Sequence, residues 1–281
     1  MQRQVRTSVR GQRTQDGAGV SLVRVLGQET AKEFDPFLML DSFDSTDPAD
    51  YLAGFPLHPH RGIETVTYLA QGAMVHTDNL GNRAEIGSGE AQWLTAGSGA
   101  FHSEMPRAAE RMLGVQVWLN LPQKDKMADP AYRGIRAEDI PEVEEAGGTV
   151  RVIAGSLGDA HGCQGAYLPL DFYDVRLVAG GAIEVPADAD ATCVVFTLEG
   201  PVQVGEAAVA AKTAALLGPG DCVRLSAGDQ GAEALVMCAP ALHEPLALYG
   251  PLAMNTMDEI ITALDEIDAG TFVKVEQRYA D

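Results

Sequence analysis

The chain repeats one pattern of strands and glycine turns at an interval of about 130 residues. In the first half, an alternating strand that ends in glycine precedes a glycine-rich turn and a second apolar strand, in VTYLAQG (66–72) and IGSGEAQWLTAGSG (86–99). The same order recurs in the second half, in VVFTLEG (194–200) and LGPGDCVRLSAGDQG (217–231). Because each interval has the length of one small barrel, the repeat predicts two β-barrels in one chain.

The composition agrees with this turn-rich architecture, since the 281 residues include 30 glycines and 15 prolines. We therefore predict an all-β fold of two double-stranded, jelly-roll-like barrels. Residues 1–135 would form the N-terminal domain and residues 136–281 the C-terminal domain. A short helix is predicted near the end of the chain, where Thr256 and Glu259 form a capping box ahead of Ile260.

The formal net charge of −20 excludes one class of partner. An acidic surface is repelled by phosphates, so direct nucleic-acid binding is not expected. No apolar run approaches the roughly 18 residues of a membrane helix, so no membrane span is expected either. The cysteines are spread through the second half without a CxxC motif, which predicts reduced thiols in a cytoplasmic protein. They are Cys163, Cys193, Cys222 and Cys238.

Three of the six histidines lie in two short motifs, HPH and HSE. Side chains two positions apart in a strand share a face, so His58 and His60 point one way, and His102 and Glu104 do the same in a second strand. Two such strands side by side would aim all four side chains at one point. Three imidazoles and a carboxylate, without a thiolate, predict a site for iron, manganese, copper, nickel, cobalt or a catalytic zinc.

Four protein ligands on an octahedral metal would leave two neighbouring positions for a substrate oxygen and dioxygen. Glu64 has the same strand parity as the HPH histidines, and three roles are open to it. It could be a fifth ligand, a base behind the metal, or a buried carboxylate bonded to Arg61 or a backbone amide. The remaining histidines are not expected to be ligands: His76 near the barrel rim, His161 in a glycine-rich turn, and His243 near the end of the second barrel.

Five segments extend the pattern in order along nearly the whole chain. They are DPFLMLDSF (35–43), GFPLHPHRGIETVTYL (54–69), QWLTAGSGAFHSEMP (92–106), VQVWLNLP (115–122) and GPLAMNT (250–256). Together they resemble the pirin family of two-domain cupins. The resemblance implies an iron(II) ion in the N-terminal barrel and a C-terminal barrel without metal. The implied ligands are His58, His60, His102 and Glu104, whereas many other cupins place the ligand carboxylate at the position of Glu64.

The resemblance implies two alternative functions. In the first, the protein is a quercetin 2,3-dioxygenase: a flavonol, a small planar phenolic, binds the metal through its 3-oxygen, reacts with O2 and releases carbon monoxide. Glu104, or Glu64 behind it, would take the hydroxyl proton. In the second, a redox change of the metal regulates a protein partner. A monomer is expected in either case. The predicted pocket walls are apolar and aromatic: Phe43, Phe55, Leu57, Met74, Trp93, Phe101 and Met105.

Overall fold

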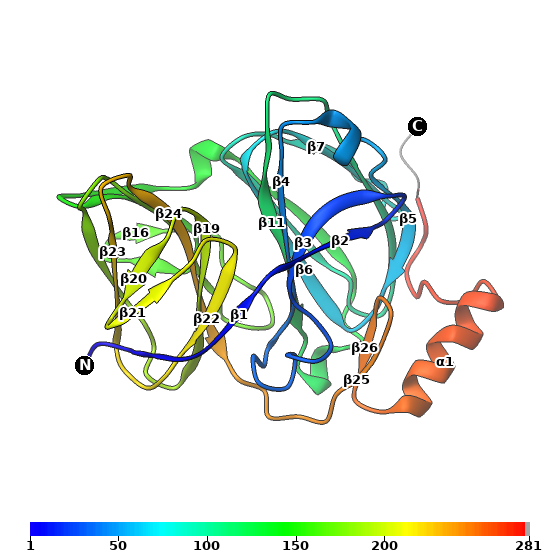
Figure 1. Cartoon of the computed structure of the whole chain (residues 1–281). Helices are drawn as coiled ribbons and strands as arrows, with labels where there is room; N and C mark the ends of the chain where they lie inside the picture. The colour runs from blue at the N-terminus through cyan, green and yellow to red at the C-terminus, as the bar shows by residue number, and fades with distance from the viewer. Residues whose placement is uncertain (279–281) are drawn as a thin grey trace. The chain divides into compact units, whose positions relative to one another are not determined.

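The computed structural model describes residues 1–278, which form β-strands with one α-helix. The chain divides into two compact units (Figure 1). The N-terminal barrel comprises residues 13–137 and the chain from residue 242 onward, and the C-terminal barrel comprises residues 1–12 and 138–241. These units differ from the expected division at residue 135 at both ends of the chain. The first strand belongs to the C-terminal barrel, and the final helix belongs to the N-terminal barrel.

The N-terminal barrel consists of two antiparallel sheets whose facing side chains meet. The larger sheet runs, in spatial order, through β12 (Ala131–Ile135), β9 (Glu90–Thr95), β6 (Ile63–Gln71), β11 (Met112–Asn120), β4 (Phe37–Ser45), β3 (Val20–Leu26) and β2 (Gln12–Asp16). The smaller sheet contains β5 (Phe55–His60), β10 (Ala100–Pro106), β7 (Met74–Asp78) and β8 (Arg83–Ile86). Three single 3-10 turns lie in the connections: η1 (Pro48–Asp50), η2 (Gln123–Asp125) and η3 (Ala137–Asp139).

The C-terminal barrel repeats this plan. Its larger sheet contains β1 (Val5–Arg10), β22 (Thr213–Leu217), β19 (Ala191–Glu199), β24 (Ala232–Pro240), β17 (Asp171–Leu177), β14 (Gly148–Ala154) and β13 (Glu142–Glu145). Its smaller sheet contains β18 (Ala182–Pro186), β23 (Cys222–Ala227), β20 (Val202–Val204) and β21 (Ala207–Val209). A hairpin of β15 (Ser156–Leu157) and β16 (Ala160–His161) completes the unit. The predicted all-β fold of two cupin barrels is confirmed.

The two barrels differ in what fills them. In the C-terminal barrel one cluster of buried apolar side chains joins both sheets and includes Val195 and Val223. The sequence repeat aligns these valines with Thr67 and Gln92 of the N-terminal barrel, which are also buried. Buried polar side chains need hydrogen-bond partners, so the N-terminal interior requires hydrogen bonds at two positions where the C-terminal interior has valines.

The last strands and the helix pack against the N-terminal barrel. A hairpin of β25 (Ala247–Tyr249) and β26 (Leu252–Met254) leads into α1 (Met257–Asp268), which lies beside it (Figure 1). Thr256 caps the helix and forms the predicted capping box with Glu259. Ile260 and Phe272 are buried in an apolar cluster against which Phe101 of β10 packs. The helix is thereby tied to the strand that carries His102.

Arg61, which directly follows the HPH motif, is the main polar anchor of this C-terminal segment. Its side chain is almost fully buried. The guanidinium donates to the carbonyl oxygens of Ser98 and Phe272 at 2.7 Å each, and it forms an ion pair with Glu266 at 2.7 Å. It also lies 4.2 Å from the centre of the Phe272 ring, which suits a cation–π contact. Arg61 therefore holds α1 and the following residues against the end of β5.

Lys126 is a second buried anchor. Its Nζ atom lies 3.0 Å from the Gly62 carbonyl, 2.6 Å from Asn120 Oδ1 and 2.8 Å from the Ala253 carbonyl. Burial lowers the pKa of Lys126 to about 8, so the ammonium group persists at neutral pH. Its three N–H groups match the three acceptors, which lie on separate segments of the barrel.

One sequence expectation about cysteines is wrong. Cys193 of β19 lies opposite Cys238 of β24, and the structure joins them in a disulfide. Cys163 and Cys222, the other two cysteines, form no disulfide within residues 1–278. The two partners are 45 positions apart, and only the antiparallel register of β19 and β24 makes them neighbours.

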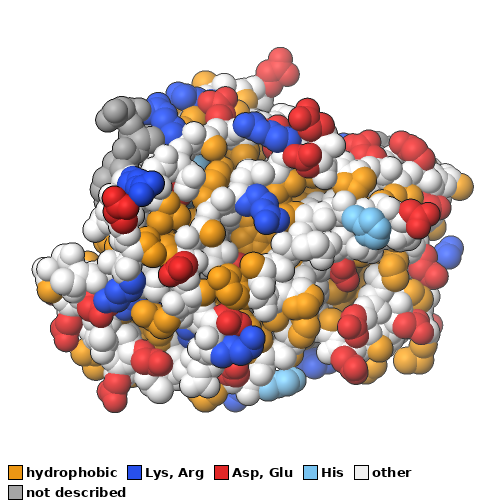
Figure 2. All heavy atoms as spheres, turned by 180° about the vertical axis from the view of Figure 1, so that it is seen from behind, with side chains coloured by type: hydrophobic (Ala, Val, Ile, Leu, Met, Phe, Trp, Pro, Cys, Tyr) orange, Lys and Arg blue, Asp and Glu red, His pale blue; other side chains and the backbone are white. Residues whose placement is uncertain are grey.

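The surface carries charges of both signs. On the face seen in Figure 2, acidic and basic side chains are interspersed, with hydrophobic atoms between them. This face offers no continuous basic area of the kind that binds phosphate backbones. Within residues 1–278, no helix is long and apolar enough to cross a membrane.

We expect Gly62→Ala to loosen the packing of the β25–β26 hairpin against the residues that follow β5. Gly62 has φ +76°, and a Cβ atom there would lie 2.0 Å from the Ala253 carbonyl oxygen. Gly270→Ala is the matched control, because Gly270 has φ +70° but open space around it. The control should cost about 1 kcal/mol from backbone strain alone. Gly62→Ala should cost about 2 kcal/mol more, from overpacking. Equal unfolding free energies in denaturant titrations would contradict this close approach.

Candidate metal centre

Three imidazoles converge in the N-terminal barrel. His58 and His60 come from β5 and His102 from β10, and the antiparallel register places His102 opposite His58. One ring nitrogen from each lies within 4.8 Å of the other two. His60 and His102 are buried, whereas His58 is partly exposed. The predicted meeting of the HPH and HSE strands is therefore present.

The hydrogen bonds of the HPH histidines determine which nitrogens carry lone pairs. The Nδ1 atom of His58 lies 2.8 Å from the Pro56 carbonyl, and that of His60 lies 3.1 Å from the Pro251 carbonyl. A carbonyl can only accept, so both Nδ1 atoms must carry hydrogen. Each neutral ring then has its lone pair on Nε2, and the two Nε2 atoms face each other at 3.1 Å. Two facing lone pairs repel unless a cation or a proton lies between them.

The environment favours a cation other than a proton. Burial, followed by the neighbouring His58, lowers the pKa of His60 to about 3. Burial also lowers the pKa of His102 well below its usual value. The Nε2 atom of His102 is buried and has no hydrogen-bond partner among the described residues. Neutral imidazoles with unpartnered, converging lone pairs fit a divalent metal ion.

Glu104 lies beside this group but outside it. Its carboxylate accepts hydrogen bonds from Gln92 Nε2 and Gln116 Nε2 at 2.6 Å each and from Thr67 Oγ1 at 3.2 Å. A carboxylate offers about four acceptor sites, so these three bonds leave capacity for one more partner. The assignment of Glu104 as the fourth ligand stays a prediction, and the structure adds three side chains that orient it.

Glu64 does not belong to the group of three histidines. It is buried in β6, and the Thr95 hydroxyl donates to its Oε1 atom at 2.6 Å. Burial raises the pKa of Glu64, and the hydrogen bond from Thr95 offsets only part of this effect. The guanidinium of Arg61, suggested as a partner from the sequence, bonds instead to the C-terminal segment.

A pocket of about 590 Å³ opens at the histidines. It is lined by His58, His60 and Gln116, by apolar side chains and by polar side chains near Asp41. The apolar lining comprises Leu38, Met39, Phe55, Pro56, Leu57, Trp118, Leu248 and Pro251. A mainly apolar pocket with a few convergent polar groups is typical of a small-molecule site.

The predicted walls of this pocket were mostly wrong. Of the seven apolar residues expected, only Phe55 and Leu57 line it. Phe43 and Met74 are buried in the barrel core, and Trp93 is buried elsewhere in β9. Phe101 contacts Phe272, and Met105 is exposed. Strand parity alone does not distinguish side chains that line a pocket from those that fill the rest of a barrel.

A charged group on the pocket wall was also missed. Arg24 of β3 forms two hydrogen bonds with the Asp41 carboxylate, at 2.9 and 2.7 Å, and a third with Asp16 at 2.6 Å. All three residues line the pocket. Their hydrogen-bond capacity would suit the hydroxyl groups of a bound ligand.

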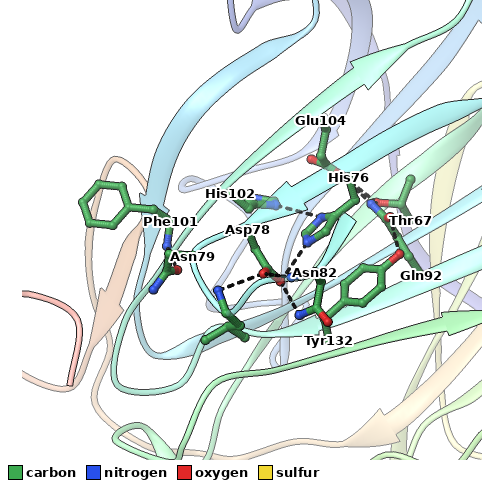
Figure 3. Close-up of polar contacts among 11 residues, drawn as sticks. Thr67, His76, Asp78, Asn79, Asn82, Gln92, Phe101, His102, Glu104 and Tyr132 are labelled. Atoms are coloured by element: carbon green, nitrogen blue, oxygen red, sulfur yellow. Dashed lines mark hydrogen bonds and ion pairs between the residues drawn. The ribbon is translucent and has the colours of Figure 1, made fainter. Parts of the chain in front are cut away.

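His76 lies closer to the candidate metal centre than the sequence indicated. It is fully buried, its ring stacks on Tyr132 with centroids 4.2 Å apart, and its Nδ1 atom lies 3.5 Å from His102 Nδ1 (Figure 3). Its Nε2 atom lies 3.1 Å from Asp78 Oδ2. The only sequence signal was the HTD motif, in which a histidine and an aspartate share one strand face. His161 and His243 lie outside the group of three histidines.

Two barrels, one of them holding an interior group of three histidines, define a bicupin with a candidate metal centre. Family profiles agree: residues 19–119 match "Pirin" and residues 172–273 match "Pirin C-terminal cupin domain". The chain belongs to the pirin family.

Two curated relatives match nearly the whole chain. A pirin-like protein of Caulobacter vibrioides is 43% identical over 94% of this chain and 97% of its own. A protein of Pseudomonas aeruginosa, provisionally named quercetin 2,3-dioxygenase, is 45% identical over 92% of this chain and 94% of its own.

Solved structures share the fold. A quercetin 2,3-dioxygenase from Acinetobacter baumannii superposes with a TM-score of 0.88, at 32% identity, over 97% of this chain and 99% of its own. A bacterial pirin from Escherichia coli, solved in complex with nickel(II), shares the fold with a TM-score of 0.64 at 18% identity, over 84% of this chain and 99% of its own.

We expect His58→Ala or His102→Ala to lose most of the bound metal while the barrels stay folded. Each variant removes one Nε2 lone pair from the group, whereas the two barrel cores are independent of one ion. Metal analysis after purification without added metal, with circular dichroism of the same samples, measures both effects. His161→Ala, an exposed histidine of the C-terminal barrel, is the control and should retain wild-type metal content. Wild-type metal content in both site variants would remove the assignment.

The full chain should bind one metal ion. Among residues 1–278, His58, His60 and His102 form the only group of three potential ligand side chains of this kind. The C-terminal barrel is instead filled by apolar side chains. Titration of the metal-free chain should therefore saturate at one equivalent, and saturation near two would show that a second site was missed.

Proposed function

We propose that the N-terminal barrel binds iron(II) through His58, His60, His102 and Glu104, and that the protein is a quercetin 2,3-dioxygenase. The observation that carries the proposal is the convergence of one ring nitrogen from each of His58, His60 and His102, the first two of which line a pocket. The provisional dioxygenase name of the Pseudomonas relative and the Acinetobacter structure support the substrate class.

The pocket suits a planar phenolic. Its volume of about 590 Å³ lies within the range of roughly 300–1,000 Å³ for small-molecule sites. Phe55 and Trp118 offer aromatic faces for ring contacts. The Arg24–Asp41 pair on the same wall offers donors and acceptors for hydroxyl groups. Together these residues would bind the flavonol and orient it toward the histidines.

The reaction consumes one O2 per flavonol, opens the central ring and releases one carbon monoxide, leaving a depside. A bound iron ion would supply Lewis acidity and redox chemistry with dioxygen. The chain must accept the proton of the 3-hydroxyl. Gln116 lines the pocket and donates to Glu104 Oε2, so it connects the pocket with the carboxylate. Glu104 would hold that proton while the substrate oxygen carries negative charge.

Glu104→Gln tests the enzymatic function. The substitution removes the charge and places an amide where Gln92 and Gln116 already donate, so it opposes both proton acceptance and metal binding. We expect turnover of quercetin by the iron-loaded protein to fall by roughly 10²- to 10⁴-fold. Oxygen uptake and carbon monoxide release measure it, after quercetin has been bound anaerobically. Glu110→Gln changes an exposed carboxylate and should leave the rate unchanged.

Absolute turnover distinguishes an enzyme from a slow side reaction, because ordinary enzymes turn over about ten times per second. A metal-loaded protein that binds quercetin but releases no carbon monoxide would contradict the dioxygenase assignment. That outcome would favour the alternative drawn from the sequence, a metal-dependent regulator that acts through a protein partner.

A further inference from the structure

His76 and Asp78 form a buried pair on β7, beside the strand that carries His102. The register places Asp78 opposite His102 and His76 opposite Glu104. Both members of the pair are fully buried, and neither belongs to the group of three converging histidines. Buried titratable groups are often found at functional sites, so this acid and histidine beside the candidate metal centre are candidates for a functional role.

The hydrogen-bond partners of Asp78 determine the direction of the hydrogen bond between His76 and Asp78. The backbone N–H groups of Leu80 and Asn82 donate to its Oδ1 atom at 2.9 and 3.0 Å. The side-chain amide of Asn82 donates to Oδ2 at 2.8 Å (Figure 3). A carboxylate surrounded by donors acts as an acceptor, so the Nε2 atom of His76, 3.1 Å from Oδ2, must carry a hydrogen.

The direction of the hydrogen bond from His76 to Asp78 determines the direction of the next one, between His76 and His102. With hydrogen on Nε2, neutral His76 has its lone pair on Nδ1. That atom lies 3.5 Å from Nδ1 of His102, which must therefore be the donor. His102 then carries its hydrogen on Nδ1 and its lone pair on Nε2, the buried atom without a partner. The stacked ring of Tyr132 keeps His76 in the required plane.

We propose that Asp78 and His76 are positioning residues that hold His102 in the Nδ1–H tautomer, so that its Nε2 lone pair is available to the metal. The inference rests on the proposed metal site but not on flavonol chemistry. His58 and His60 are held by backbone carbonyls, which only accept, whereas His102 is held by a side chain that can exist in either tautomer. His102 is thus the one histidine of the three whose tautomer depends on a distant carboxylate.

Asp78→Asn tests this relay, the chain of hydrogen bonds from His102 through His76 to Asp78. The substitution changes the hydrogen-bond direction while the shape of the side chain stays nearly constant. The backbone amides of Leu80 and Asn82 would retain the amide oxygen of the new side chain. Its NH2 group would face His76, and the Asn82 side-chain amide would turn to present its oxygen to that NH2 group. His76 Nε2 would then accept, its Nδ1 would donate, and His102 would be forced to carry hydrogen on Nε2. The tautomers can be read from 15N chemical shifts of the metal-free protein after selective histidine labelling.

We expect wild-type His102 to be the Nδ1–H tautomer and Asp78→Asn to convert it to Nε2–H. The affinity for iron(II), measured anaerobically by competition with a chelator, should fall about 10- to 100-fold. Thr77→Val is the control, since Thr77 lies on the same strand with its side chain on the opposite face. It should change neither the tautomer nor the affinity.

Several results would overturn the relay. An Nε2–H tautomer in wild-type His102 would do so even if the variant failed to fold. An unchanged tautomer, or an affinity within about twofold of wild type, in folded Asp78→Asn would do the same while leaving the metal site intact. Failure of the wild-type chain to bind iron(II) would instead refute the site itself.

Discussion

The candidate metal centre of the N-terminal barrel depends on one constraint: three imidazoles, two of them buried, bring one ring nitrogen each within 4.8 Å of the other two. Such an arrangement persists only if the opposite nitrogen of each ring is held by an acceptor. The three acceptors come from different parts of the barrel. Pro56 precedes His58 on the same strand, Pro251 lies in the C-terminal hairpin, and His76 lies on β7. The smaller sheet, the hairpin and the HTD motif therefore all serve the geometry of one small group.

The two barrels show how one architecture supports two interiors. In the C-terminal barrel, positions that align with Thr67 and Gln92 are valines, and the space between the sheets is filled by apolar contacts. In the N-terminal barrel, the polar versions of these positions donate toward Glu104. Apolar packing supports a fold by burial alone, whereas a polar interior needs every partner in place. This difference accounts for the candidate metal centre lying in one barrel although both share the strand plan.

The C-terminal segment completes the candidate site as well as the fold. Arg61 and Lys126 connect it to the end of β5 through buried charged hydrogen bonds, and the adjoining Pro251 carbonyl orients His60. A buried charge is costly unless its donors are matched, and here each donor set meets carbonyl or carboxylate oxygens. The position of His60 is thereby coupled to residues nearly two hundred positions away, so the hairpin contributes to the candidate site as well as to the N-terminal barrel.

The sequence by itself determined the two-barrel fold, the capped helix and the convergence of His58, His60 and His102, because periodicity two in a strand and side-chain identity are both readable from residue order. Only the tertiary structure decided which backbone carbonyls orient those rings, since every residue has a carbonyl and none is marked in the sequence. The same holds for the pocket walls, for the Cys193–Cys238 pairing and for the exchange of terminal segments between units. These features depend on strand register and on contacts between distant segments, and local patterns carry no information about either.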